Sequence, residues 1–205
     1  MKNNDERLAD VLGRLDKLSY VKLEKIPELD LYMDQVTSFM EEQLKDTKRN
    51  QEDKVLTKTM INNYAKNRLL PPPVKKKYSK EHMLLLLFIY YYKNLLSFND
   101  IEQLFLPITK NYFSASSDLS LSAIYQEVFT LEKEQKERVK KDVQAKFQAA
   151  KTTFTDIDEK EREYLQLFSF ISELSFDVYL KKQMIEAIID QLREEGADSG
   201  KKKHP

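Results

Sequence analysis

Glycine is scarce in this chain, and its scarcity restricts the folds that the chain can adopt. The 205 residues include three glycines, at positions 13, 196 and 200. Loops that cradle phosphate groups need glycine because the backbone must approach the phosphate closely, which excludes a P-loop and a dinucleotide-binding fingerprint. Tight hairpins also depend on glycine turns. Residues 108–195 contain neither glycine nor proline, so we predict an all-α protein with long C-terminal helices and without tight hairpins.

The cellular compartment is limited by other features of the composition. Cysteine is absent, which excludes disulfides, thiolate metal sites and cysteine nucleophiles and suits a reducing cytoplasm. Residues 1–10 are polar and acidic, unlike a secretory signal. The longest apolar run, Met83–Tyr92, has ten residues, whereas a transmembrane helix needs about 20. We therefore expect a cytoplasmic protein without a membrane segment.

Apolar residues recur at helical spacing along most of the chain. They predict helices over residues 4–18, 30–44, 57–68, 80–94, 98–105, 119–150 and 155–195. Thr57, Ser79 and Ser97 stand where N-caps are expected, and Pro107 is expected to end the helix that follows Ser97. Residues 45–54 have no apolar side chain and predict a loop, and the segment "VKKKY" at 74–78 predicts a short extended stretch.

The last two predicted helices differ in character. The apolar stripe of residues 119–150 narrows to Val139, Val143 and Phe147 amid many charges, and a narrow stripe of this kind resembles a coiled-coil seam. Thr155 is the expected cap of the last helix, which is either continuous or broken near Ser175.

Sites for metal or acid–base chemistry are not indicated. The two histidines, His82 and His204, have no histidine or cysteine at ligand spacing. The carboxylates of residues 156–163 are explained by the preference of acidic side chains for a helix N-terminus. The serines of residues 114–122 are explained by capping and have no histidine partner. We therefore predict no catalytic residue, no cofactor, no metal and no enzymatic activity.

Positive charge is concentrated in one stretch of a chain that has no net charge. Between Lys54 and Lys80 there are eight basic residues and no acidic one. On a helical wheel, the helix after Thr57 carries its polar residues on one half, and this half has no carboxylate. Its members are Lys58, Thr59, Asn62, Asn63, Lys66 and Asn67.

These residue types suit DNA. Lysine neutralises phosphates and releases counterions, asparagine can pair with adenine through two hydrogen bonds, and threonine can touch the methyl group of thymine. Three further lysines, Lys75, Lys76 and Lys77, follow after the prolines. The same surface also fits an acidic protein partner, and lysines in a loop can simply keep the loop soluble.

The order of parts resembles a MerR-type winged helix-turn-helix. In that family a groove-entering helix carries a tyrosine and ends in leucine and prolines, and a basic wing, a Ser-capped helix and a Ser-Phe turn follow. This chain has Tyr64, Leu69–Leu70, Pro71–Pro73, "VKKKYS" and "LSFNDI". Two positions depart from the pattern, with Asn62 where MerR proteins usually have arginine and Arg68 where they usually have glycine. The segment over about 28–110 is more closely similar to a bacterial family of unknown function, domain of unknown function 1836.

The resemblance implies a site and an assembly. It implies a recognition helix at about 57–68, anchored by Tyr64, and a basic wing at 74–78. The implied DNA-binding residues are Lys58, Thr59, Asn62, Asn63, Lys66, Lys75, Lys76 and Lys77. A long helix after the winged module, here 119–150, would pair with its twofold mate.

We therefore predict four segments and one leading function. The segments are an N-terminal helix (1–27), a winged helix-turn-helix-like domain (28–112), a helical dimerisation or regulatory region (113–196) and a flexible tail (197–205). The leading function is a DNA-binding transcriptional regulator that acts on double-stranded DNA as a homodimer through its C-terminal helices. The alternative is a helical adaptor that docks an acidic protein through the same surface. The sequence identifies no small-molecule effector.

Overall fold

The computed structural model describes residues 2–114 and 119–201, with side chains up to Gly196. The chain forms two compact units. Unit 1 joins the N-terminal residues up to Ser19 with Leu131–Ile185, and unit 2 joins Tyr20–Thr130 with the described residues from Glu186 onward. Helices dominate both units, and the sheet found among the described residues has two strands. The protein is therefore all-α, as predicted. In the described part of the chain, no helix has an apolar segment long enough to cross a bilayer.

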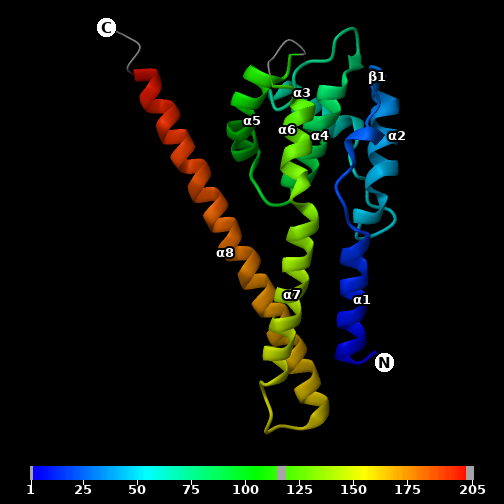
Figure 1. Cartoon of the computed structure of the whole chain (residues 1–205), viewed down its shortest axis with the longest axis vertical. Helices are drawn as coiled ribbons and strands as arrows, with labels where there is room; N and C mark the ends of the chain where they lie inside the picture. Colours follow the sequence, from blue (N-terminus) through cyan, green and yellow to red (C-terminus); the bar gives the residue numbers. More distant parts are fainter. Residues whose placement is uncertain (1, 115–118, 202–205) are drawn as a thin grey trace. The chain divides into compact units, whose positions relative to one another are not determined.

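Unit 2 contains most of the short elements (Figure 1). In chain order they are η1 (Leu23–Lys25), β1 (Leu31–Tyr32), α2 (Met33–Leu44), η2 (Lys45–Thr47), α3 (Lys58–Lys66), β2 (Lys77–Tyr78), α4 (Lys80–Tyr92), α5 (Phe98–Tyr112) and α6 (Leu121–Thr130). The C-terminal part of α8 (Glu159–Lys201) completes the unit.

Helix α4 forms the core of unit 2 because it is apolar on all sides. Every side chain from Met83 to Ile89 is buried, and each buried side chain of this size stabilises the fold by about 1.5–3 kcal/mol. Helix α6 runs beside α4 (Figure 1), and the buried Tyr125 hydroxyl donates a hydrogen bond of 2.7 Å to the Val21 carbonyl. The neighbouring elements add apolar side chains to the same core, namely Val36, Met40, Ile61, Tyr64, Ile101, Phe105, Leu121 and Ile189.

Three predicted N-caps are present. The Thr57 hydroxyl accepts a hydrogen bond from the Met60 amide at 3.2 Å, and the Ser97 hydroxyl accepts one from the Asp100 amide at 3.2 Å. Ser79 stands at the N-cap of α4. Short side-chain oxygens at these positions satisfy amides that have no partner inside the helix, which is why the helix starts could be located from the sequence.

The prediction that Pro107 ends a helix is wrong. Helix α5 continues through Pro107 to Tyr112. A proline inside a helix removes one backbone hydrogen bond and costs about 3 kcal/mol. Burial offsets this cost, because Phe105 is buried and Leu104 and Ile108 pack against the core of unit 2. The apolar stripe of α5 therefore extends the helix past the residue that should have ended it.

The prediction that the chain avoids tight hairpins is also wrong. Val74 and Lys77 exchange two backbone hydrogen bonds, of 3.1 and 2.9 Å, so residues 74–77 form a two-residue hairpin. Lys75 and Lys76 occupy its turn with φ of 50° and 64°, the left-handed values that a type I′ turn requires at both central positions. The segment predicted as extended therefore reverses direction. Strand β2 then pairs antiparallel with β1, with Leu31 opposite Tyr78 and Tyr32 opposite Lys77.

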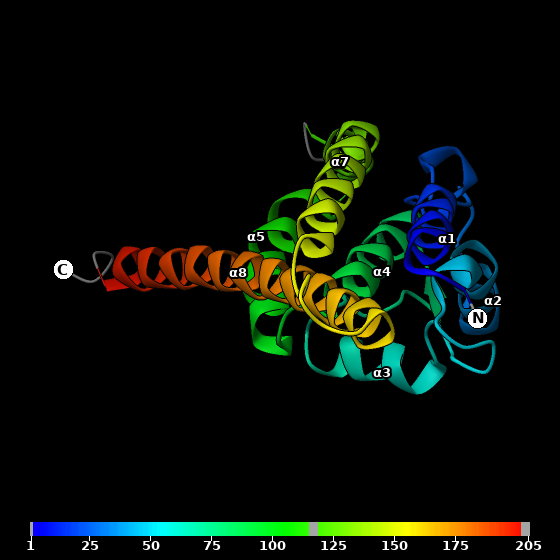
Figure 2. The same ribbon diagram turned by 90° about the horizontal axis from the view of Figure 1, so that it is seen from below.

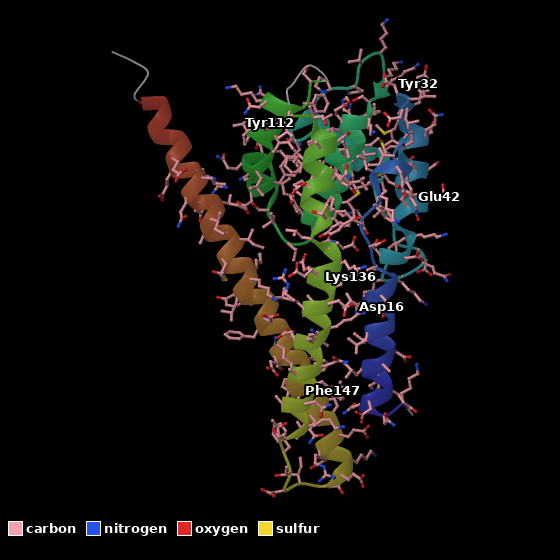
Figure 3. All side chains as sticks on the ribbon, viewed as in Figure 1. Asp16, Tyr32, Glu42, Tyr112, Lys136 and Phe147 are labelled. Atoms are coloured by element: carbon pink, nitrogen blue, oxygen red, sulfur yellow. The ribbon has the colours of Figure 1, made fainter. Side chains whose placement is uncertain are left out.

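Unit 1 is built from α1 (Asn4–Lys17), α7 (Glu132–Lys151) and the first part of α8. Val143 and Phe147 of α7 and Phe170 of α8 are buried together, and Leu8 and Leu12 of α1 pack against them. Figure 3 shows Phe147 on α7 and Asp16 on α1. Asp16 forms an ion pair with Lys140, and Asp5 forms one with Lys151 at 3.0 Å.

The long C-terminal helices differ from their predicted limits. Residues 119–150 were expected to form one helix, but α6 ends at Thr130 and α7 begins at Glu132, because each helix buries its apolar stripe in a different core. Helix α8 begins at Glu159, where the Asp158 carboxylate accepts a hydrogen bond from the Lys160 amide at 3.2 Å, so Thr155 is not its cap. The helix is unbroken at Ser175, whose hydroxyl donates to the Ile171 carbonyl at 2.8 Å.

Candidate nucleic-acid interface

Helix α3 separates its side chains into a buried face and an exposed polar face. Ile61 and Tyr64 are buried, and Figure 2 shows the helix along an outer edge of unit 2. Tyr64 therefore anchors the helix in the core, as the sequence predicts. The structure brings five of the predicted site residues together on the exposed side of α3, namely Lys58, Thr59, Asn62, Asn63 and Lys66.

The C-terminal end of α3 is fixed by the leucine pair that follows it. The amides of Leu69 and Leu70 both donate to the Tyr64 carbonyl, at 2.9 and 3.2 Å, and both side chains are fully buried. Arg68, just before this pair, has a φ of 63°. Glycine adopts a left-handed backbone more readily than arginine does, so this position carries local strain.

The hairpin presents the remaining predicted residues in two ways. Lys75 and Lys76 form the turn and are exposed. Lys77 lies in β2 and is half-buried, with its ammonium 5.2 Å from the centre of the Tyr32 ring. Figure 3 marks Tyr32 at the end of β1. Lysine over an aromatic face is a cation–π contact, so Lys77 holds the two strands together, while Lys75 and Lys76 are directed to solvent.

The base of the hairpin is held by a buried histidine. His82 packs edge-on against the rings of Tyr78 and Phe113, at 5.4 and 4.8 Å, and its Nδ1 accepts a hydrogen bond from the Ser79 amide at 3.0 Å. Burial lowers the pKa of His82, and the nearby carbonyls of Pro72 and Pro71 oppose that shift. The sequence shows only that His82 stands beside a helix cap. Its packing role depends on the ring of Phe113, which comes from a segment farther along the chain.

The connection between α2 and α3 is ordered around Val55. The Glu41 carboxylate of α2 accepts a hydrogen bond from the Val55 amide at 3.2 Å and pairs with Lys48, and these partners hold the pKa of Glu41 below its usual value. Lys93 directly follows α4. Its ammonium donates a hydrogen bond to the Val55 carbonyl at 2.8 Å, and burial lowers the pKa of Lys93. These contacts fix the start of α3 despite the length of the connection.

The basic stretch has acidic neighbours in space that it lacks in sequence. Lys58 forms an exposed ion pair with Asp34 of α2, and the mostly buried Lys80 side chain pairs with the exposed Glu28. An exposed pair such as Lys58–Asp34 contributes about 0–1 kcal/mol, so a stronger anion can displace Asp34. Asp34 stands in "LYMDQV", outside the basic stretch of residues 54–80, so the charge pattern of that stretch does not reveal the pairing.

Two shallow hollows flank α3. One, of about 350 Å³, lies between α2 and the start of α3, and it is lined by Thr37, Ser38, Glu41, Lys54, Leu56, Thr57 and Lys58. The other, of about 370 Å³, is lined mostly by apolar side chains of α3, α4, α5 and the segments between them, together with Lys93 and Asn94. Within residues 2–114 and 119–201, no cluster of three or more histidine, aspartate or glutamate side chains could hold a metal.

A comparison with protein-family models matches residues 21–128 to one family, described as domain of unknown function (DUF1836). The match covers more than half of the chain and nearly all of Tyr20–Thr130, the continuous segment of unit 2 that carries α3, the hairpin and α4. Neither the search of curated proteins nor the search of solved structures gave a significant match. On the family comparison, this chain belongs to the DUF1836 family.

Proposed function

We propose that this protein is a sequence-selective DNA-binding transcriptional regulator that acts as a homodimer, with unit 2 as a MerR-like winged helix-turn-helix. One observation supports the proposal above the others. A carboxylate-free polar helix face and a basic hairpin tip are both exposed on one unit, and both are anchored to the same α4 core through Tyr64 and His82.

Helix α3 is the proposed recognition helix. It has nine residues and is therefore about 13 Å long, which suits a major groove about 12 Å wide. Thr59, Asn62 and Asn63 would contact base edges, and Lys58 and Lys66 would contact phosphates. A phosphate would replace Asp34 as the partner of Lys58, because their exposed pairing is weak.

The hairpin is the proposed wing. Lys75 and Lys76 at its tip would contact the sugar–phosphate backbone, and such contacts position a protein on DNA without reading its sequence. Lys77 would act indirectly, by holding β2 to Tyr32. Each phosphate contact that a lysine makes contributes a slope of about 0.9 to the dependence of log K on log salt.

Fluorescence anisotropy tests this function on the full-length protein. Binding to random duplex DNA should weaken by on the order of a thousandfold between about 50 and 200 mM salt if six or more phosphates are contacted. The Lys75→Ala/Lys76→Ala variant should bind more weakly and lower the salt slope by about two. The charge-matched control is Lys133→Ala/Lys141→Ala, which removes two exposed lysines from α7 and should bind like wild type.

Two outcomes would contradict the proposal. If the wild-type protein does not bind duplex DNA at the lowest salt, DNA is not its ligand, and an acidic protein partner becomes the better candidate for the same surface. If both double variants weaken binding equally, the effect comes from net charge and the hairpin is not a wing.

A further inference from the structure

Unit 1 leaves more large apolar side chains exposed than it buries. Its described core consists of Val143, Phe147, Ala150 and Phe170. Over the part of α8 in this unit, the exposed large apolar side chains are Tyr164, Phe168, Ile171, Phe176, Val178, Tyr179, Leu180, Met184 and Ile185. Soluble monomers rarely leave a large contiguous apolar patch uncovered, so the placement of these side chains around α8 decides whether they form one.

Part of this surface forms a regular stripe. Tyr164, Phe168, Ile171, Ser175 and Val178 follow one another at intervals of four, three, four and three residues, which is the heptad spacing of a coiled-coil seam. The four apolar members are each more than half exposed, from 53% for Ile171 to 67% for Tyr164. Other side chains of α8, Leu167, Phe170 and Leu174, contact the core of unit 1, so the stripe is not needed for packing inside the unit.

The apolar stripe of residues 119–150, which the sequence indicates as a coiled-coil seam, is covered within unit 1 over its α7 part. Val143 and Phe147 are buried in unit 1, and Val139 packs against them. An intermolecular contact through these side chains would have to open the core of unit 1. The surface that is available for a partner is therefore on α8.

We propose that the α8 stripe pairs antiparallel with the same stripe of a second copy of this chain. Charge selects the orientation. Lys182 occupies the next position of the repeat after Val178. In a parallel pair each Lys182 would meet its own counterpart, whereas an antiparallel pair places Phe168 opposite Val178 and brings Lys182 beside Tyr164 and Glu161 of the other copy. An aromatic face and a carboxylate both favour a nearby lysine.

The stripe supplies part of the area that a homodimer interface needs. From Tyr164 to Lys182 it extends over about 27 Å of helix. Exposed side chains of this size contribute on the order of 100 Å² each, so the four apolar members supply about half of the 800 Å² that each partner buries in a standard interface. The flanking Tyr179 and the aliphatic stem of Lys182 add to it. The small Ser175, placed opposite Ile171, allows the helices to approach closely.

Sedimentation equilibrium of the full-length protein without DNA tests the pairing. The wild-type chain should have twice its mass of 24.3 kDa. Ile171→Glu, which puts a charge in the seam, should give a monomer with unchanged helical circular dichroism. The matched control is Met184→Glu, an equally drastic change at an exposed position on another side of α8, and it should remain dimeric. A monomeric wild type, or equal dissociation by both variants, would overturn the proposal.

Disulfide trapping tests the orientation, because the chain has no cysteine of its own. When Phe168→Cys protein is mixed with Val178→Cys protein and oxidised, the antiparallel pair predicts a disulfide between the two different variants. Disulfides within each variant alone would show a parallel pair, and no disulfide at all would show that the stripe is not the interface.

The pairing supplies the homodimer that the proposed function requires, and the two can fail separately. A monomeric chain would overturn the pairing and leave the anisotropy experiment on α3 and the hairpin as it stands. A dimer that does not bind DNA would keep the α8 interface and remove the proposed function.

Discussion

Arg68 is one of four non-glycine residues in the described part of the chain whose backbone is left-handed. Its φ of 63° lies in the left-handed region, which costs an L-residue other than glycine roughly 1–2 kcal/mol. The Arg68→Gly variant should therefore raise the free energy of unfolding by about 1 kcal/mol, as measured by urea denaturation. Arg68→Ala removes the same side chain and keeps the strain, so it should not stabilise. If both variants gain equally in free energy of unfolding, the cause is the lost charge of Arg68 and not its backbone conformation.

His82 should make the stability of unit 2 depend on pH. Burial lowers its folded-state pKa below the ordinary value of 6.5, although Pro72, Pro71, Glu81 and Asp30 oppose the shift. The unfolded chain therefore takes up the proton first as the pH falls. The free energy of unfolding should decrease from about pH 7 downward and level off below the folded-state pKa.

Thermal unfolding between about pH 7 and 5 measures this effect. The control is His82→Asn, whose side-chain oxygen can replace Nδ1 as the acceptor for the Ser79 amide and which does not titrate. It should flatten the pH dependence over this window, and an unchanged slope in the variant would assign the dependence to carboxylates.

At the scale of single residues, the sequence predicted the features that depend on residues nearby in the chain. Thr57 and Ser97 were located because capping acts over three residues, and Tyr64 was located because the apolar period places it inward. The pairing of Lys58 with Asp34 joins residues 24 positions apart, and no local pattern records it.

At the scale of elements, the hairpin has two separable properties. Lysine at both turn positions of φ 50° and 64° is strained, while Asn-Gly is the preferred pair there. The Lys75→Asn/Lys76→Gly variant should raise the free energy of unfolding by about 1 kcal/mol and lower the salt slope of DNA binding by about two.

The comparison variant for the hairpin is Lys75→Ala/Lys76→Ala. It should lower the salt slope equally without a gain in stability, because alanine keeps the unfavourable φ. Urea denaturation and anisotropy on the two variants separate the properties. Full DNA affinity in the Asn-Gly variant would show that the lysines do not contact DNA.

Two elements show why local rules failed. Glycine scarcity excluded a tight turn at residues 74–77, and Pro107 excluded a continuous α5, but both elements exist. In each case tertiary packing outweighs a local cost. Tyr78 is buried against His82 on one side of the hairpin, and Phe105 is buried in the core of unit 2. The local costs, a turn without glycine and a proline inside a helix, are visible in the sequence. The packing contacts that offset these costs come from other segments of the chain.

For the whole molecule, pairing through α8 predicts that stability depends on concentration. A dimer interface stabilises the folded chain by mass action, and each tenfold increase in protein concentration should raise Tm by about 2 °C. Differential scanning calorimetry of wild type and of Ile171→Glu over a hundredfold range measures this. The variant should show a Tm that does not change with concentration, and the same flat response in wild type would contradict the pairing.

The helical class of the molecule could be predicted from composition, and its division into units could not. Periodicity assigns helices one at a time, whereas unit 1 depends on α1 meeting α7, more than a hundred residues later in the chain. Leu8 and Leu12 of α1 pack on the core of α7 and α8, and the Asp16–Lys140 and Asp5–Lys151 pairs also join α1 to α7. These contacts join residues that lie too far apart in the chain for a short stretch of sequence to contain both partners.

The interleaved order of the units has a consequence for how the protein is made. Helix α1 leaves the ribosome before its partners in unit 1, which begin at Leu131. At 5–20 residues per second, the intervening segment takes on the order of 10 s to synthesise. During that time the α1 segment lacks the partners that cover its apolar face, while most of unit 2 can already collapse around α4. Residues 4–17 are therefore the part of unit 1 that stays longest without its packing partners, open to chaperones and proteases.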